Sequence, residues 1–261
     1  MTAENKIKRA VTVIITIVII VLLCAGYYAA MGGKITALIN TGERLLPVYS
    51  VETDEKVVAI SFDAAWGNEF TDDILNILDE YDARATFFLV GFWIDEYPQD
   101  VRAIAERGNE IGSHSATHPD LTTCSREQIE RELDETTEKI KETAGVVPVL
   151  FRAPYGAYDN NLINIAEEKG YQVIQWDVDS LDWKDISEEQ IVERVVRNVR
   201  NGSIVLFHNN AQYVSCYLPR ILQKLTDNGY KVVAVGDLVL KENYYIDHTG
   251  RQFPAESGKG K

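Results

Sequence analysis

Acidic and imidazole side chains follow several apolar runs of this chain. Asp63 ends the run "VVAISFD", His208 ends "IVLFH", and His114 and His118 lie four residues apart in "HSATH". Two imidazoles at this spacing can bind zinc or a similar ion from one face of a turn. With acids nearby, the pair predicts a metal site that has a candidate base in Asp63. Each residue also has a structural alternative. Asp63 could be a structural carboxylate bonded to loop amides, "HSATH" could be a polar loop with a capping histidine, and His208 could be a core histidine.

Arg152 and Asp182 are candidates for tuning these groups. Arg152 follows an apolar run and is placed to pair with a carboxylate, with a surface cation as the alternative. An arginine beside a carboxylate favours the ionised form. Asp182 would hold His208 charged and ready to donate a proton. Three aromatic residues near these positions either line a groove for sugar rings or belong to the core: Trp66, Tyr155 and Trp183.

Strand and helix patterns alternate between residues 56 and 240, and this alternation predicts how the side chains are positioned. The expected strands are 56–64, 84–91, 109–114, 149–156, 171–180, 203–209 and 230–239. The expected helices are 69–83, 97–108, 125–145, 159–170, 187–202 and 218–229. Two helices begin with a capping box, Ser125 with Gln128 and Ser187 with Gln190. Strands alternating with glycine-terminated helices are typical of βα units around a parallel sheet.

The number of strands favours a barrel. Seven strands fit in about 185 residues, and no phosphate-loop glycines follow the first strand, as a dinucleotide-binding sheet would require. In a βα barrel the carboxyl ends of the strands share one rim, where active sites are built. Three of the four histidines fall at this expected rim, together with the acidic candidates.

Composition limits the partners. The chain has 261 residues, a formal net charge of −14 and 46% hydrophobic residues, which suits a globular protein with a full core. A net negative charge of this size predicts no nucleic-acid partner.

The first 33 residues differ in kind. Lys6, Lys8 and Arg9 precede an uncharged stretch at 10–33 that is long enough to cross a bilayer. The basic flank belongs on the cytoplasmic side, so the rest of the chain is expected outside the cell, held by a single-pass anchor in the cell membrane. A cleaved signal peptide, giving a secreted protein, and a lipidated Cys24 are the alternatives.

The remaining chain divides into three ranges. We expect a linker at 34–55, the folded domain at 56–240 and a polar, loosely held tail at 241–261. Beyond the anchor, Cys124 and Cys216 are expected to be buried free thiols, with a disulfide as the alternative.

Five motifs in order resemble those of polysaccharide deacetylases with a NodB homology domain. They are "SFDAAWG", "HSATH", "RAPY", "DSLDW" and "LFH", and the resemblance covers roughly residues 56–240. It implies a distorted (β/α)7 barrel and metal-dependent removal of acetyl groups from N-acetylated sugars. The stretch leading into the first motif is similar to that of membrane-anchored, sporulation-type cell-wall deacetylases.

The resemblance also implies residue roles. A divalent ion, zinc with cobalt or manganese as alternatives, is expected on His114 and His118. Asp63 is the expected base, held ionised by Arg152, and His208 is the expected acid, tuned by Asp182. Tyr155 is expected to contribute a backbone N–H to the oxyanion, and Trp66 and Trp183 to contact the sugar. The substrate would be peptidoglycan N-acetylglucosamine or N-acetylmuramic acid, and the protein a monomer.

Ala64 departs from the family pattern. The first motif usually carries a second aspartate that binds the metal, and this chain has alanine there. Three outcomes stay open: water, or an acid of the same loop such as Glu69 or Asp72, fills the position at lower metal affinity; the enzyme works with a weakly held ion; or the site is inactive on the usual substrate. Two rival functions stay open: an inactive, membrane-tethered glycan-binding protein, favoured by Ala64, and an O-acetyl esterase.

Overall fold

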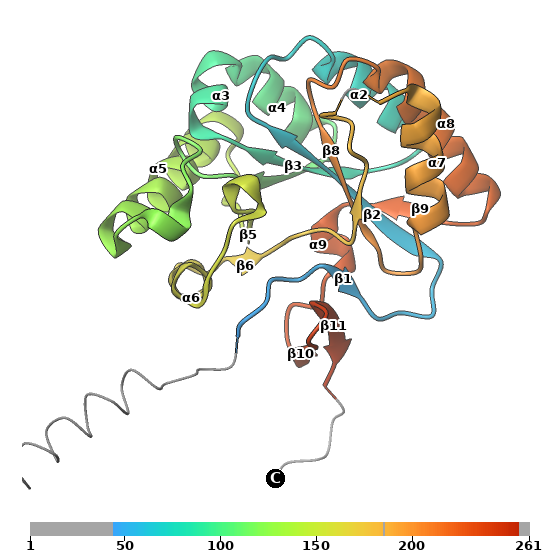
Figure 1. The fold of residues 1–261 in the computed structure, drawn as a ribbon. Coiled ribbons are helices and arrows are strands. Elements are labelled where there is room, and N and C mark those ends of the chain that lie inside the picture. The colour runs from blue at the N-terminus through green and yellow to red at the C-terminus, as the bar shows by residue number, and fades with distance from the viewer. Residues whose placement is uncertain (1–43, 185, 256–261) are drawn as a thin grey trace, which may run out of the picture. The chain divides into compact units, whose positions relative to one another are not determined.

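A parallel sheet built around β2 (Val57–Ala64) forms the centre of the molecule (Figure 1). The computed structural model describes residues 44–184 and 186–255. The strand order is β6-β5-β4-β3-β2-β8-β7, every pair is parallel, and β9 pairs with the first residues of β2. The other strands are β3 (Ala85–Leu89), β4 (Glu110–Ser113), β5 (Leu150–Phe151), β6 (Gln172–Val173), β7 (Val178–Asp179), β8 (Ile204–His208) and β9 (Lys231–Val233). This arrangement fits the predicted distorted (β/α)7 barrel.

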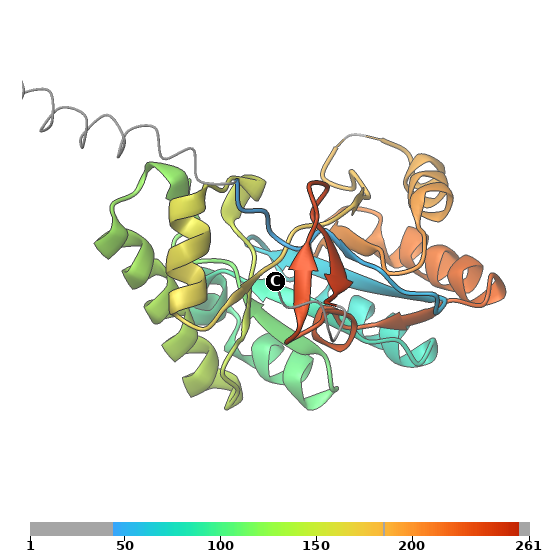
Figure 2. The same ribbon diagram turned by 90° about the horizontal axis from the view of Figure 1, so that it is seen from below.

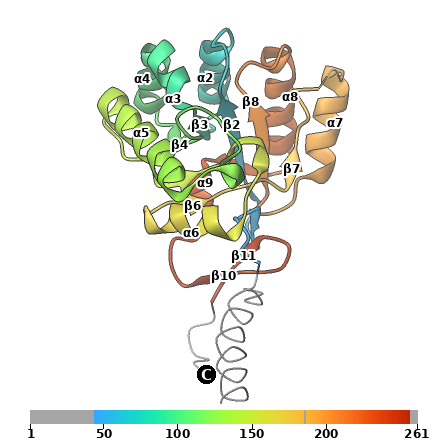
Figure 3. The same cartoon turned by 60° about the vertical axis from the view of Figure 1, so that its left-hand side comes forward.

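Helices lie around the sheet, as the turned view in Figure 3 shows. Their buried apolar side chains pack against those of the strands. They are α2 (Thr71–Glu80), α3 (Gly91–Glu96), α4 (Pro98–Glu106), α5 (Arg126–Ala144), α6 (Asn160–Glu168), α7 (Glu188–Asn198), α8 (Val214–Asp227) and α9 (Val235–Leu238). Both predicted capping boxes are present, at the starts of α5 and α7. Among the described residues, no helix is long and apolar enough to cross a membrane, and the predicted span at 10–33 lies outside them.

Three predicted strands are divided. The range 149–156 forms β5 and then the short turn Pro154–Gly156. The range 171–180 forms β6, which pairs with β5, and β7, which pairs with β8 at the other side of the sheet. Between them the chain bonds elsewhere: the amide of Gln175 donates to Val48 and that of Asp177 to Ile204. The range 230–239 forms β9 and then the short helix α9. The helix expected at 187–202 ends at Asn198.

A second, three-stranded sheet lies outside the predicted range 56–240. It contains β1 (Ser50–Val51), β11 (Arg251–Pro254) and β10 (Tyr244–Ile246), seen from below in Figure 2. The side chain of Gln252 is fully buried and both accepts from and donates to the backbone of Leu240. This contact and the pairing of β11 with β1 and β10 hold residues 241–255 in place, in contrast to the loosely held tail that the sequence predicts.

An aromatic stack fixes the two central strands. Phe62 packs on Phe207 with ring centroids 5.6 Å apart, and Phe207 packs on Tyr217 of α8 at 5.9 Å. Because side chains alternate along a strand, the next residues, Asp63 and His208, point to the opposite face. The two residues are register partners of β2 and β8.

The two cysteines beyond the predicted anchor are free. Cys124 is half-buried and Cys216 is exposed, so neither thiol is buried, in contrast to the expectation, and the alternative of a disulfide between them does not occur. Cys216 lies on the outer face of α8, where the helix meets solvent.

Candidate active site

Asp63 and Arg152 form a buried ion pair. Arg152 follows β5, and its Nη1 donates to Oδ1 of Asp63 at 2.7 Å, while its Nη2 donates to the hydroxyl of Ser61 at 2.9 Å. The guanidinium is fully buried and its carbon lies 4.1 Å from the ring centre of Phe88. Arg152 is therefore fixed in the interior, where its charge acts on Asp63, and it is not a surface cation.

The electrostatics of the site favour an ionised Asp63. Burial alone would raise the pKa of this carboxyl, but the charge of Arg152, together with His114 and His208, holds it below its usual range. An ionised carboxylate with one oxygen on Arg152 leaves the other oxygen able to accept a proton. That oxygen, Oδ2, lies 3.6 Å from Nε2 of His114.

The loop after β4 carries both histidines of the "HSATH" motif. The start of α3 holds this loop, because the amide of Gly91 donates to Ser115 and that of Phe92 to Ala116. A Cβ at position 91 would lie 2.9 Å from the Ala116 backbone, so the approach requires glycine.

The two imidazoles have nitrogens available for a cation. Nδ1 of His114 donates to the carbonyl of Arg152 at 2.7 Å, which leaves Nε2 as the lone-pair nitrogen. Nδ1 of His118 is buried without a hydrogen-bond partner among the described residues, and the two rings lie 4.9 Å apart. Burial and the neighbouring His114 lower the pKa of His118 to about 4, and burial also lowers that of His114. Neutral imidazoles with unpaired nitrogens fit a divalent ion such as zinc.

The protein supplies fewer ligands than a closed metal site. Within residues 44–184 and 186–255 there is no group of three or more His, Cys, Asp or Glu side chains placed to hold a metal. Ala64 is fully buried, and Glu69 and Asp72, the proposed substitutes, are exposed and absent from the cavity lining. The two histidines are therefore the protein ligands that the described residues offer, and water is left for the remaining positions.

His208 and Asp182 form the second ion pair of the site. Oδ1 of Asp182 lies 2.7 Å from Nδ1 of His208, and Oδ2 accepts from the His208 amide at 2.9 Å. Burial would lower the pKa of His208, but the hydrogen bond and charge of Asp182 raise it above its usual value. His208 is therefore suited to carry a proton and to donate it from Nε2.

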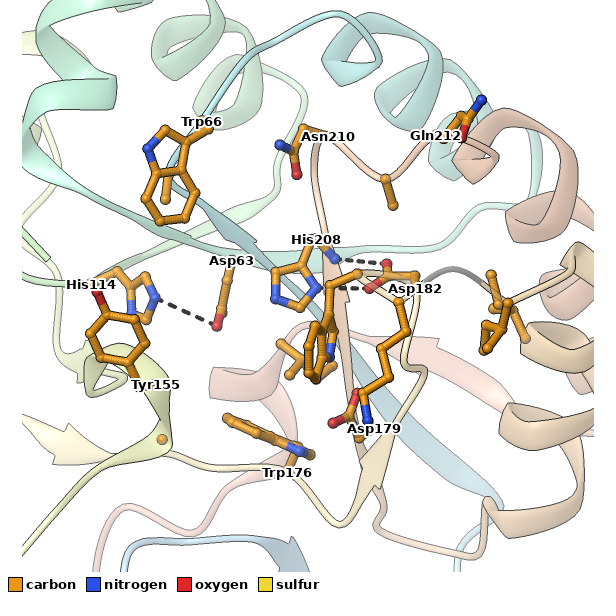
Figure 4. A pocket seen from close by; sticks show the side chains of 18 of the residues that line it. Asp63, Trp66, His114, Tyr155, Trp176, Asp179, Asp182, His208, Asn210 and Gln212 are labelled. Carbon is orange, nitrogen blue, oxygen red and sulfur yellow. Dashed lines mark hydrogen bonds and ion pairs between the residues drawn. The ribbon is translucent and has the colours of Figure 1, made fainter.

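A cavity of about 720 Å³ lies at the carboxyl ends of the strands. Its lining includes Asp63, His114, His118, Asp182 and His208. Figure 4 shows Asp63 between His114 and His208, with the His208–Asp182 pair on the far side of the carboxylate from His114. Trp66, Tyr155 and Trp183 line the same cavity and are 58%, 69% and 58% exposed, so they are rim residues and not core residues. Aromatic faces of this kind can stack on sugar rings.

Tyr155 has a strained backbone at the rim. Its φ is +60°, in the left-handed region, and it lies in the short turn Pro154–Gly156. Its ring packs against His118, with centroids 4.7 Å apart, and Trp66 packs on the same imidazole at 5.2 Å. Strain at a non-glycine residue is common at functional sites.

Other lining residues were not predicted. Trp176 lies between β6 and β7, and Lys184, Asn210 and Tyr213 lie in the two loops that follow β7 and β8. Nothing in the sequence around these four residues indicated that they line the cavity. Proximity to the "DSLDW" and "LFH" motifs would have been the one available guide.

Comparison with known proteins identifies the class to which this fold and site belong. The family model "Polysaccharide deacetylase" matches residues 50–174. A peptidoglycan-N-acetylglucosamine deacetylase of Bacillus cereus is 34% identical over 196 residues, which cover 73% of this chain and 92% of that protein. The chain therefore belongs to the polysaccharide deacetylase family.

Two further relatives differ in what is said of them. The uncharacterized protein YlxY of Bacillus subtilis is 35% identical over 193 residues, 74% of this chain, and the match spans only 60% of YlxY. The structure of BA3943 from Bacillus anthracis, described as a CE4 family pseudoenzyme, has a TM-score of 0.71 and 33% identity, covering 74% of this chain and 68% of that one.

Proposed function

We propose that this chain is a metal-dependent N-deacetylase of cell-wall glycan, acting on N-acetylglucosamine or N-acetylmuramic acid of peptidoglycan. The observation that carries the proposal is the placement of a candidate base and a candidate acid, each with its own charged partner, in one cavity. Asp63 is held by Arg152, His208 is held by Asp182, and the two strands that carry them are hydrogen-bonded neighbours. Hydrolysis of an amide needs both groups, because the departing amine must be protonated.

The reaction would use this chain's groups in order. Asp63 accepts a proton from the attacking water through Oδ2. The backbone N–H of Tyr155 stabilises the developing oxyanion, and one such donor is worth roughly 3 kcal/mol in other enzymes. His208 then donates its Nε2 proton to the amine nitrogen as the carbon–nitrogen bond breaks. A divalent ion on His114 and His118, zinc with cobalt or manganese as alternatives, would supply Lewis-acid polarisation of the acetyl carbonyl.

The rim supports a polymeric sugar substrate. Trp66 and Trp183 present exposed rings at the cavity mouth, and Tyr155 presents a third. The His208–Asp182 pair favours an amide over an O-acetyl ester, since an alkoxide leaving group depends less on a strong acid.

A glycan-binding protein without catalysis is the second candidate. Ala64 removes a carboxylate from the expected metal site, and a relative of similar fold is described as a pseudoenzyme. A mutant of that relative is described as having restored enzymatic activity. Its structure is 34% identical to this chain, with a TM-score of 0.71, and the match covers 74% of this chain and 70% of the mutant. The same fold therefore supports both active and inactive proteins. The retained base, acid, Arg152 and Asp182 favour the enzyme.

The proposed setting is the outer side of the cell membrane. The uncharged stretch 10–33 and its basic flank support a single-pass anchor, with secretion as the outcome if the stretch is cleaved. The proposed partners are the glycan and the membrane, with the protein acting as a monomer, and a role in sporulation follows only from the subfamily resemblance.

The test measures acetate release by the full-length chain in detergent. The protein is stripped with a chelator, zinc, cobalt or manganese is added back, and purified peptidoglycan and chitooligosaccharides are the substrates. We expect metal-restored release that Asp63→Asn lowers by about 100-fold or more. Absence of release with every metal, combined with glycan binding, would favour the non-catalytic candidate.

A further inference from the structure

Tyr217 of α8 contacts the His208–Asp182 pair through the Asp182 carboxylate. Its side chain is fully buried, and its hydroxyl donates to Oδ2 of Asp182 at 2.8 Å. The same oxygen accepts from the His208 amide, and the other oxygen pairs with Nδ1 of His208. Asp182 therefore has three partners on its two oxygens, and its side chain is fully shielded from solvent.

The fold leaves the Tyr217 ring little freedom to move. The ring stacks on Phe207 with an interplanar angle of 17°, and Phe207 stacks in turn on Phe62. These phenylalanines immediately precede His208 and Asp63, so one aromatic column supports the acid, the base and the Tyr217 hydroxyl. The hydroxyl position is thus set by the core.

Tyr217 acts as a permanent donor. Burial, together with the neighbouring Asp182 charge, raises the pKa of its phenol far above the usual value, so it keeps its proton throughout the working range. A hydrogen bond donated to a carboxylate favours its ionised form. The Tyr217 hydroxyl therefore acts on the same carboxylate that pairs with Nδ1 of His208.

We infer that Tyr217 is a positioning residue that fixes the orientation of the Asp182 carboxylate toward His208, and that it thereby sets how readily His208 gives up its proton. The inference rests on the proposed function for its catalytic meaning, because His208 is the acid there. During the reaction the proton passes from His208 Nε2 to the amine nitrogen, while Tyr217 keeps its own.

Several charged or titratable groups surround His208, and the test must separate Tyr217 from them. They come from β2, the loop after β4, β7, the loop after β7 and α8: Asp63, His114, His118, Asp179, Asp182 and Tyr217. All except Tyr217 are unchanged in a Tyr217→Phe variant, which also keeps the ring that stacks on Phe207.

The experiment compares Tyr217→Phe with Tyr171→Phe in the full-length chain in detergent. Tyr171 is a matched control, since its buried hydroxyl pairs with Thr137 and it does not line the cavity. Labelling histidine rings with ¹⁵N gives signals from only four residues, and a pH titration without metal reports the His208 pKa without turnover. We expect Tyr217→Phe to raise this pKa by about half a unit to one unit, because the carboxylate loses one donor and interacts more strongly with the His208 imidazolium.

Turnover supplies the second measurement. We expect kcat to fall about tenfold with KM within about twofold, the range that loss of an outer hydrogen bond produces elsewhere. An unchanged or lowered His208 pKa, or an equal change in Tyr171→Phe, would overturn the inference. If wild type releases no acetate, the titration still decides on Tyr217 while the proposed function fails separately. If Tyr217→Phe does not fold, 3-fluorotyrosine incorporated at position 217 keeps the ring and makes the hydroxyl a stronger donor, and it should lower the His208 pKa instead.

Discussion

The guanidinium of Arg152 reaches Asp63 across the interior of the sheet. Arg152 follows β5 and Asp63 lies in β2, with β4 and β3 between them in the strand order, yet Nη1 and Oδ1 are 2.7 Å apart. Neither side chain is more than 10% exposed. The candidate base is therefore kept charged by a partner from a distant part of the sequence.

Removing this partner should cost both stability and activity. Arg152→Met leaves the Asp63 carboxylate buried without its cation, so we expect about 3 to 5 kcal/mol less free energy of unfolding. The pKa of Asp63 should rise, moving the acid limb of the rate profile upward. Urea unfolding and acetate release measure the two effects.

An exposed ion pair provides the control. Arg107→Met breaks a pair with Asp79 in which both side chains are partly exposed, and the change in unfolding free energy should stay below about 1 kcal/mol. Equal losses in the two variants would contradict the assigned role of Arg152.

The pH dependence of acetate release should be bell-shaped. Asp63 must be ionised, and its pKa is held below the ordinary 3.8, so Asp63 loses its role as a base when pH falls below that range. His208 must be protonated, and its pKa is raised above 6.5, so activity is lost as pH rises through the raised value. In Asp182→Asn the alkaline limb should move to lower pH, and an unmoved limb would count against the acid pair.

Position 64 should control metal affinity. Ala64→Asp is expected to tighten zinc binding at least about tenfold, or ~1.4 kcal/mol, in a competition titration with a chromophoric chelator. Because position 64 is fully buried, the metal-free variant should melt below wild type and recover when zinc is added. Ala64→Asn has similar size without the charge, and a matching gain in that variant would rule out a new carboxylate ligand.

The exposed rim aromatics should contribute to substrate binding. Trp183→Ala is expected to raise KM for chitooligosaccharides about two- to tenfold with a smaller change in kcat, in line with 0.5–1.5 kcal/mol per aromatic contact, roughly. Tyr245→Ala removes a similarly exposed ring from β10, away from the cavity lining, and should leave KM unchanged. A KM effect of the same size in both variants would show that neither ring acts as a sugar platform.

Local chemistry in the sequence determined much of this protein. The capping boxes at Ser125 and Ser187, the strand–helix alternation and the placement of Asp63 and His208 at strand ends all depend on near neighbours and could be predicted. The five motifs also indicated the family, because their residue types and order are specific.

Tertiary structure alone decided the relationships over long distances. The split of 171–180 into β6 and β7, the burial of Gln252 against Leu240 and the exposure of Glu69 and Asp72 depend on which segments pack together. The hydrogen bond from Tyr217 to Asp182 is another case, since a tyrosine at a core position of a helix carries no sign of its hydroxyl's partner. The physical reason is that hydrogen bonds and burial between distant residues arise from packing, which short sequence patterns do not record.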